Sequence, residues 1–414
     1  MRYLVSLIEP GLGSVLTFGV NLWLIRNGAE ASYGVYVFWY AVAWMLGTLQ
    51  GTLAITHLYK LPAARDGLVA RAPAERFLLT VMLTLCVLAA LAVLAGNAAL
   101  AAHGSSLAEP GAALFIPAFL LFQYVRAFAF SRQRPAAAAV LSATVLAGAA
   151  LLLGADFALG RAPNAGRVLT LVGLAYAAPA LAVLLILLRG LRPMLGVAAL
   201  RRQAHILAGS GWLLLGAGSG EVTSRLYSFA VVARYGSEAL GALAAVQVVI
   251  RPAWMLSAAW TSIGFPAMAG AWARRDRGAV LRAMLAGAAV TTIASLSWSL
   301  VVLAAWPWIS ATLYHGRYAD PGWLVVLWGA NVMLGSIAVA LNTAMLSLGE
   351  FRRLAVLDLV AAVVVVVALA TLLPRGSPWA IGATLLGQAA QIVLMAALLR
   401  RQLRRRLGHR PEHA

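Results

Sequence analysis

The chain has 414 residues, of which 62% are hydrophobic and 11% are charged, whereas soluble domains average about 45–50% apolar and about 25% charged residues. This composition excludes a soluble globular enzyme, a disordered chain and a collagen-like fibre. The formal net charge is +19, but the charges are spread thinly between apolar runs, so the sequence does not indicate a nucleic-acid-binding protein. The only cysteine, Cys86, cannot form an internal disulfide.

Twelve apolar segments follow one another along the chain, and each is long enough for a bilayer-spanning helix of about 20 residues. In chain order they are 10–26, 31–59, 77–108, 111–131, 135–155, 168–188, 207–232, 252–273, 283–316, 321–349, 355–373 and 376–399. Their Leu, Ala and Val runs lack the two-residue alternation of a membrane barrel. The sequence therefore predicts an all-α membrane protein of about twelve transmembrane helices. The N-terminal region carries Glu9 and Asn21, which argues against a cleavable signal peptide.

Basic residues gather on one side of this topology. With the N-terminus inside, the inner loops and tail hold 23 basic residues and the outer loops hold 6. Because cytoplasmic loops carry the excess of Lys and Arg, both termini are expected to be cytoplasmic. Every outer loop is short, so we expect no extramembrane catalytic domain.

The pattern Arg-x-Gly-x-Glu occurs twice, at 26–30 and 208 residues later at 234–238. Each copy follows the first predicted helix of one half, which indicates an internal parallel repeat; the alternative is a chance match between two short loops. The expected organisation is a six-helix bundle at 1–188, a basic linker or amphipathic helix at 189–206, a six-helix bundle at 207–399 and a basic tail at 400–414.

These features resemble the polysaccharide-type flippases of the multidrug/oligosaccharidyl-lipid/polysaccharide (MOP) exporter superfamily, such as the O-antigen flippases. The resemblance rests on the run 25–36 (IRNGAEASYGVY), its counterpart at 234–241, Pro62 and Pro266, and the turns 126–134 and 349–353. It implies a multi-pass protein of the bacterial inner membrane. It also implies that the two bundles rock in alternating access, and that the cargo is a polyprenyl-diphosphate-linked glycan.

Three arginines lie within the predicted spans or directly at the end of one, where a charge should face a cavity or a partner. Arg251 precedes Pro252, which should kink its helix. Arg225 follows Glu221 at the i,i+4 spacing of an ion pair, so it either neutralises Glu221 or binds cargo. Arg126 either binds cargo or extends to the cytoplasmic headgroups. These arginines are the candidate diphosphate ligands, because guanidinium binds phosphate through two hydrogen bonds.

Other polar residues complete the candidate site. Side chains that could bind sugar hydroxyls or simply link helices are Gln247, Gln123, Asn331 and Asn342. Glu221 is the candidate coupling residue for H⁺ or Na⁺, whereas Glu9 and Asp358 are expected to be interfacial. Candidate hinge positions, or alternatively close-packing positions, are Gly216, Gly218 and Gly220, with Pro252 as a further hinge.

Enzymatic alternatives lack essential parts. No outer loop carries paired carboxylates for glycosyl chemistry, no Cys/His cluster could bind zinc, and no phosphate-binding loop occurs. We therefore expect a flippase for cell-surface polysaccharide biosynthesis, without covalent catalysis, metal or cofactor. Membrane lipids, a polysaccharide polymerase and export machinery are its expected partners. The alternatives are a multidrug exporter, a general sugar or ion carrier, and an integral-membrane polysaccharide-synthesis enzyme.

Overall fold

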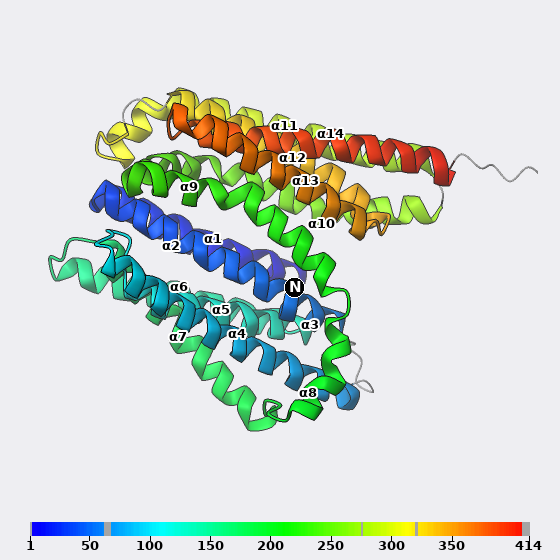
Figure 1. Cartoon of the computed structure of the whole chain (residues 1–414), viewed down its shortest axis with the longest axis horizontal. Helices are drawn as coiled ribbons and strands as arrows, with labels where there is room; N and C mark the ends of the chain where they lie inside the picture. The colour runs from blue at the N-terminus through cyan, green and yellow to red at the C-terminus, as the bar shows by residue number, and fades with distance from the viewer. Residues whose placement is uncertain (1, 62–67, 275, 319–321, 408–414) are drawn as a thin grey trace, which may run out of the picture. The chain divides into compact units, whose positions relative to one another are not determined.

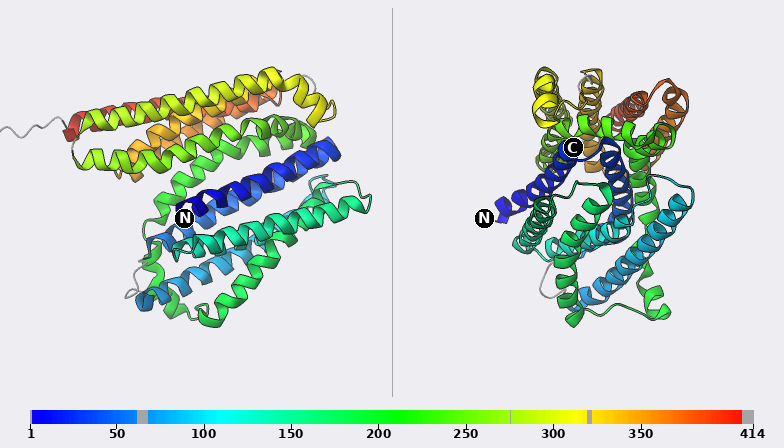
Figure 2. Two further views of the ribbon diagram at one scale, coloured as in Figure 1. Left: turned by 180° about the vertical axis from the view of Figure 1, so that it is seen from behind. Right: turned by 90° about the vertical axis from the view of Figure 1, so that its left-hand side faces the viewer.

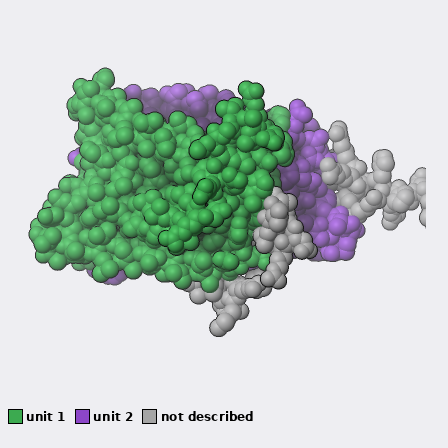
Figure 3. Space-filling model, turned by 90° about the horizontal axis from the view of Figure 1, so that it is seen from below, with its two compact units in different colours: residues 1–214 green, residues 215–414 purple. Residues whose placement is uncertain are grey.

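The computed structural model describes residues 2–61, 68–274, 276–318 and 322–407. Within these ranges every regular element is helical, and the long helices of each half run side by side (Figures 1 and 2). The chain forms two compact units, residues 1–214 and 215–414, which Figure 3 colours separately. The border between them falls inside a helix, beyond the predicted linker at 189–206. Pro62, one basis of the family resemblance, lies outside the described residues.

The first unit contains the helices of the N-terminal half. They are α1 (Arg2–Asn27), α2 (Glu30–Gln50), the π-helical turn η1 (Gly51–Ile55), α3 (Thr56–Lys60), α4 (Leu68–Ala102), α5 (Gly111–Ser131), α6 (Pro135–Ala158), α7 (Ala165–Gly190), α8 (Val197–Gln203) and η3 (Ala204–Leu207). Helix α9 (Ser210–Ile250) begins in this unit and continues into the second.

The second unit contains the rest of α9 and the helices that follow. They are α10 (Pro252–Ala273), α11 (Arg277–Trp308), η4 (Ile309–Leu313), α12 (Gly322–Ser347), α13 (Phe351–Leu372), η5 (Leu373–Arg375) and α14 (Trp379–Leu407). A buried apolar cluster that includes Met268, Met284, Leu341 and Met395 joins α10, α11, α12 and α14.

Nine helices among the described residues are long and apolar enough to cross a membrane. They are α4, α5, α6, α7, α9, α11, α12, α13 and α14. The other segments predicted to span are also helical, as α1, as α2 with η1 and α3, and as α10. The total of twelve spans, the internal repeat and the cytoplasmic placement of both termini remain predictions.

The two copies of Arg-x-Gly-x-Glu form sharp turns between helices. At the first, Gly28 lies close to the Pro163 carbonyl oxygen, and the Ser32 hydroxyl accepts the Ala165 N–H at 2.6 Å. The second was expected to be a loop over 234–241, but the chain reverses at the single residue Gly236, with φ +83° and ψ 177°. That conformation is open essentially only to glycine. Tyr235 donates a hydrogen bond to the Leu373 carbonyl at 2.5 Å, so each turn contacts the connection between the last two helices of its own half.

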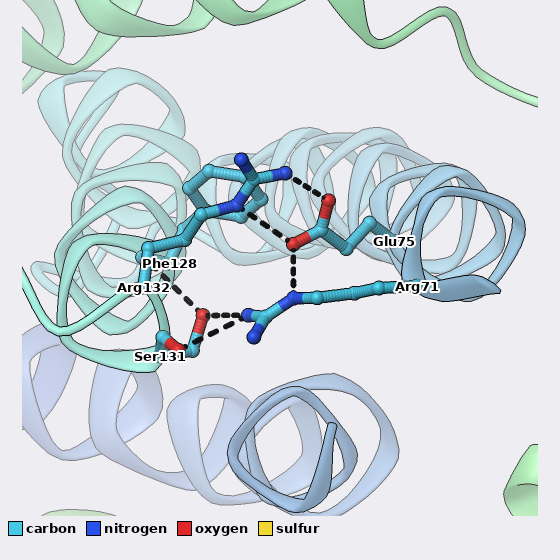
Figure 4. Close-up of polar contacts among 5 residues, drawn as sticks. All are labelled: Arg71, Glu75, Phe128, Ser131 and Arg132. Carbon is cyan, nitrogen blue, oxygen red and sulfur yellow. Dashed lines mark hydrogen bonds and ion pairs between the residues drawn. The ribbon is translucent and has the colours of Figure 1, made fainter. Parts of the chain in front are cut away.

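A buried ion cluster joins the ends of α4 and α5 (Figure 4). Arg71 donates to Glu75 at 2.6 Å, and their side chains are 1% and 0% exposed. Arg132 donates to both oxygens of the same carboxylate and packs over the Phe128 ring. Arg71 also donates to the Ser131 hydroxyl and carbonyl. Two residues counted among the inner-side charges, Arg71 and Arg132, are thus part of the internal packing of the first unit.

Candidate substrate-binding site

In the second unit, one predicted site residue, Gln247, contacts the phenol of Tyr227. Tyr227 is buried on α9, and its hydroxyl donates to Gln247 Oε1 at 3.5 Å. Arg225 and Arg251 both lie within electrostatic range of this phenol. The ring of Tyr227 meets Trp328 of α12 edge-on, with 5.6 Å between the ring centroids. The buried Tyr227 therefore contacts both Gln247 of the same helix and Trp328 of α12.

Arg225 forms an ion pair within its own helix. Its Nε lies 2.6 Å from Glu221 Oε2, one helical turn earlier, and both side chains are partly exposed. The pairing that the i,i+4 spacing suggested is therefore present. The positive charge of Arg225 is already balanced, and Glu221 is not a free carboxylate.

Arg251 lies where α9 passes into α10, directly before Pro252, and keeps helical dihedral angles, φ −53° and ψ −34°. Helix α9 ends at Ile250 and α10 begins at Pro252, because proline has no N–H to donate but fits the first position of a new helix. The Arg251 side chain is exposed. Among the described residues, no carboxylate lies within ion-pair distance of it. Arg251 is therefore available to an external anion.

In the first unit, Arg126 binds Glu9 across α5 and α1. Arg126 Nη1 donates to Glu9 Oε1 at 3.1 Å, and the two side chains are 32% and 2% exposed. Ser142 of α6 donates to the same oxygen at 2.6 Å. The Glu9 carboxylate is enclosed within the first unit, and its interfacial position remains a prediction. A buried carboxylate needs such partners, and Arg126 is held by it.

An aromatic wall lies beside Arg126. The ring of Phe119 contacts the rings of both Trp44 and Tyr176, and Tyr176 lies within electrostatic range of Arg126. Gln123, one turn earlier on α5, has a buried Oε1 without a hydrogen-bond partner in the described part of the chain. Apolar surroundings strengthen the electrostatic interactions of Arg126 and make the unsatisfied amide costly. The first unit thus also presents a cation and a free polar group together.

Comparisons with known proteins identify the fold. No family model and no curated protein matches the chain. The lipid II flippase MurJ, in an inward closed conformation, matches with a TM-score of 0.69 and 11% identity over 96% of this chain and 87% of its own. An inward-facing multidrug resistance MATE family transporter of the MOP superfamily matches with a TM-score of 0.67 and 14% identity over 97% of this chain and 98% of its own. The chain shares the fold of these two solved proteins.

Another similar solved structure is described by the polarity of its own binding pocket. A MOP superfamily transporter from Pyrococcus furiosus, described as having a pocket of reverse polarity that suggests a different function, matches with a TM-score of 0.62 and 15% identity. The match covers 97% of this chain and 94% of that protein.

The remaining predicted polar residues, Asn331 and Asn342, both lie on α12. Asn331 donates to Thr384 Oγ1 at 3.0 Å and so links α12 to α14. Asn342 has a buried Oδ1 without a partner in the described ranges. Asn331 is thus engaged in helix packing, whereas Asn342 keeps an acceptor free.

The predicted hinge glycines lie in an unbroken stretch of α9. Added Cβ atoms at Gly218 and Gly220 would meet no atom of the described chain, and one at Gly216 would make ordinary contact with Ala355. Neither Gly218 nor Gly220 is therefore needed for close helix packing within that part of the chain. The helix departs from helical geometry only at Gly236.

Sequence reasoning missed the environment of Asp358. This residue of α13 accepts a hydrogen bond from Gln391 Nε2 of α14 at 2.6 Å, and its Oδ2 lies opposite Gly216 of α9. Among the described residues no cation pairs with it. A single acid in an otherwise uncharged span, 355–373, was the signal that could have found it. No three His, Cys, Asp or Glu side chains gather within the described ranges as metal ligands would.

Proposed function

We propose that this chain is a flippase that moves a polyprenyl-diphosphate-linked oligosaccharide across the bacterial inner membrane during synthesis of cell-surface polysaccharide. The observation that carries the proposal is Arg251, a cation at the junction of α9 and α10 without an acidic partner among the described residues. An unpaired guanidinium among apolar helices is costly unless it meets an anion. A diphosphate suits it, because guanidinium donates two parallel hydrogen bonds to phosphate oxygens.

The other candidate groups have matching roles in this proposal. Arg225 and Arg126 would add positive charge, and exchange of their carboxylate partners for cargo phosphate would make binding reversible. Tyr227 orients Gln247. The groups proposed to meet sugar hydroxyls are Gln247, Gln123, Asn331 and Asn342. Supporting the lipid-linked class, one similar solved structure is a lipid II flippase.

Transport in this proposal is alternating access of the two units. Glu221 would couple the cycle to H⁺ or Na⁺, because release of Arg225 to cargo would free its carboxylate. The α9 segment with Gly216, Gly218 and Gly220 and the junction at Pro252 would supply bending. A polysaccharide polymerase and export machinery would act on the flipped product.

A multidrug exporter is the second candidate function. The observation that favours it is Asp358, a partly buried carboxylate with only an amide partner in the described chain. A carboxylate without a cation attracts cationic compounds, and one similar solved structure is a multidrug resistance transporter. On this alternative, Asp358→Asn would sensitise cells to cationic drugs, whereas Arg251→Ala would not.

Replacing Arg251 tests the flippase proposal. In cells that lack the protein, lipid-linked oligosaccharide should accumulate on the inner side, and wild-type protein should clear it. A hydrogen bond to a charged group contributes about 1.5–3 kcal/mol, so Arg251→Ala should slow clearance by about 10- to 100-fold. Arg251→Lys should restore part of the rate, because lysine keeps the charge but not the two-point geometry. Mass spectrometry of extracted lipid measures the amount of lipid-linked oligosaccharide in each strain.

The matched control is Arg400→Ala, since Arg400 is exposed on α14. It should clear lipid at the wild-type rate, and all variants should be compared at equal amounts of membrane protein. Normal lipid-linked oligosaccharide and intact surface polysaccharide in cells without the protein would reject the proposal. If the same cells are sensitive to cationic drugs, and Arg251→Ala restores their resistance but Asp358→Asn does not, the multidrug alternative is selected.

A further inference from the structure

An apolar groove of about 390 Å³ lies in the first unit between α4 and the linker elements α8 and η3. Small-molecule sites generally enclose about 300–1,000 Å³. On one side the groove is lined by Val81, Thr84 and Leu85 of α4, and on the other by Leu200, Ala204 and Leu207. The lining is almost wholly apolar, so it suits a hydrocarbon chain.

The chain leading to this groove is fixed on the surface of α4. Arg76 Nε donates to the Arg192 carbonyl at 2.8 Å, and the Met194 N–H donates to the Thr80 hydroxyl at 2.8 Å. Helix α8 follows three residues later and packs against α4. These bonds hold the two walls together, so the groove exists before anything enters it.

The linker also presents an apolar face that the protein leaves uncovered. The exposed fractions of Leu195 and Val197 are 90% and 65%, and neither α8 nor η3 has a buried residue. Exposure of such side chains to water is unfavourable. A helix with one apolar and one basic face lies at the boundary between lipid headgroups and acyl chains.

Positive charge surrounds the same linker. Residues 189–210 include four arginines and no Asp or Glu. The four are Arg189, Arg192, Arg201 and Arg202, all with exposed side chains. Arg201 also lines the groove, so a positively charged guanidinium lies next to the apolar lining. Basic residues on an amphipathic helix attract the phosphates of an anionic leaflet.

We propose that the groove between α4 and α8 is a binding site for an anionic phospholipid of the leaflet in which the linker lies. One acyl chain lies between α4 and the Leu200–Ala204–Leu207 wall, and the phosphate rests on Arg201 and Arg202. An amphiphile satisfies both halves of the surface at once, whereas a protein helix would leave the arginines without phosphate. The site is separate from Arg251 and does not depend on the transported cargo.

Lipid photolabelling of the purified full chain tests the site. The probes are phosphatidylglycerol and phosphatidylcholine, each with a diazirine on one acyl chain and at equal concentration in nanodiscs. Phosphatidylglycerol should label peptides of α4 and α8, and phosphatidylcholine should not. Because each arginine near an anionic surface contributes about five-fold in affinity, the double variant Arg201→Gln/Arg202→Gln should bind about 25-fold more weakly. Arg400→Gln/Arg401→Gln, with two adjacent exposed arginines outside the groove, should bind as the wild type does.

Two further experiments identify which part of the chain and which lipid produce the labelling. Ala204→Trp fills the groove and should abolish labelling of α4 while leaving the melting temperature of the chain unchanged. Equal labelling by both lipids, or an equal loss in the two double variants, would overturn the proposal. So would a diazirine-labelled polyprenyl diphosphate that displaces phosphatidylglycerol from α4 and α8, since the groove would then belong to the cargo. None of these measurements depends on transport, so they stand whether or not the chain is a flippase.

Discussion

Glu75→Ala is expected to lower the free energy of unfolding by about 3–5 kcal/mol, the usual cost of removing one partner from a buried ion pair. The substitution leaves Arg71, whose side chain is 1% exposed, without its carboxylate. Arg132 loses both of its bonds to the same group. Denaturant unfolding of the chain in detergent micelles, followed by tryptophan fluorescence, measures the change.

Two variants of the same cluster separate burial of charge from simple loss of contacts. Arg132→Ala should cost less, because Glu75 keeps its bond to Arg71 and the Arg132 side chain is partly exposed. The double variant Arg71→Met/Glu75→Leu should recover most of the lost stability, since apolar residues of similar volume often replace a buried pair without penalty. An unfolding midpoint for Glu75→Ala equal to that of the wild type would show that Arg71 reaches water or another partner.

Gly111→Ala is expected to destabilise the first unit by about 1–3 kcal/mol, as overpacking of a tight contact does. A Cβ at Gly111 of α5 would lie 2.3 Å from the carbonyl oxygen of Gly166, which belongs to the backbone of α7 and cannot turn aside. Close approach through small residues is how helices pack in membranes. The same unfolding measurement in micelles reports the effect.

Gly154→Ala on α6 is the matched control. Its Cβ would meet no atom of the described chain within 4 Å, and alanine favours a helix interior over glycine by about 1 kcal/mol. The two glycine substitutions should therefore change stability in opposite directions. Equal changes in the free energy of unfolding for the two variants would mean that the contact between α5 and α7 at Gly111 can widen without cost.

The helical segments could be predicted from the sequence because each apolar run is long and continuous. The predicted span 135–155 corresponds to α6, Pro135–Ala158, and the predicted span 355–373 corresponds to α13, Phe351–Leu372. The turn at Gly236 differs from the predicted loop. The length of this turn depends on whether one glycine adopts a positive φ, and a hydropathy pattern does not indicate that.

The candidate site could be predicted only as far as its contacts are local. The pairing of Glu221 with Arg225 follows from a separation of four residues on one helix. Glu9 and Arg126 are 117 residues apart, and nothing in either segment indicates the other. Asp358 and Gln391 are likewise brought together by the packing of α13 on α14.

The amino-acid sequence by itself determined that this is a helical membrane protein and that the few charged residues within its spans are the candidates for the functional site. It does so because apolar composition and run length fix the preference for a bilayer in any arrangement of the helices. Only the tertiary structure decided which charges are neutralised and which remain available. Arg126 and Arg225 are paired with carboxylates, whereas Arg251 has no carboxylate partner in the described chain. The reason is that an ion pair forms only between groups a few ångströms apart. The sequence alone does not give the distance between residues that are far apart along the chain.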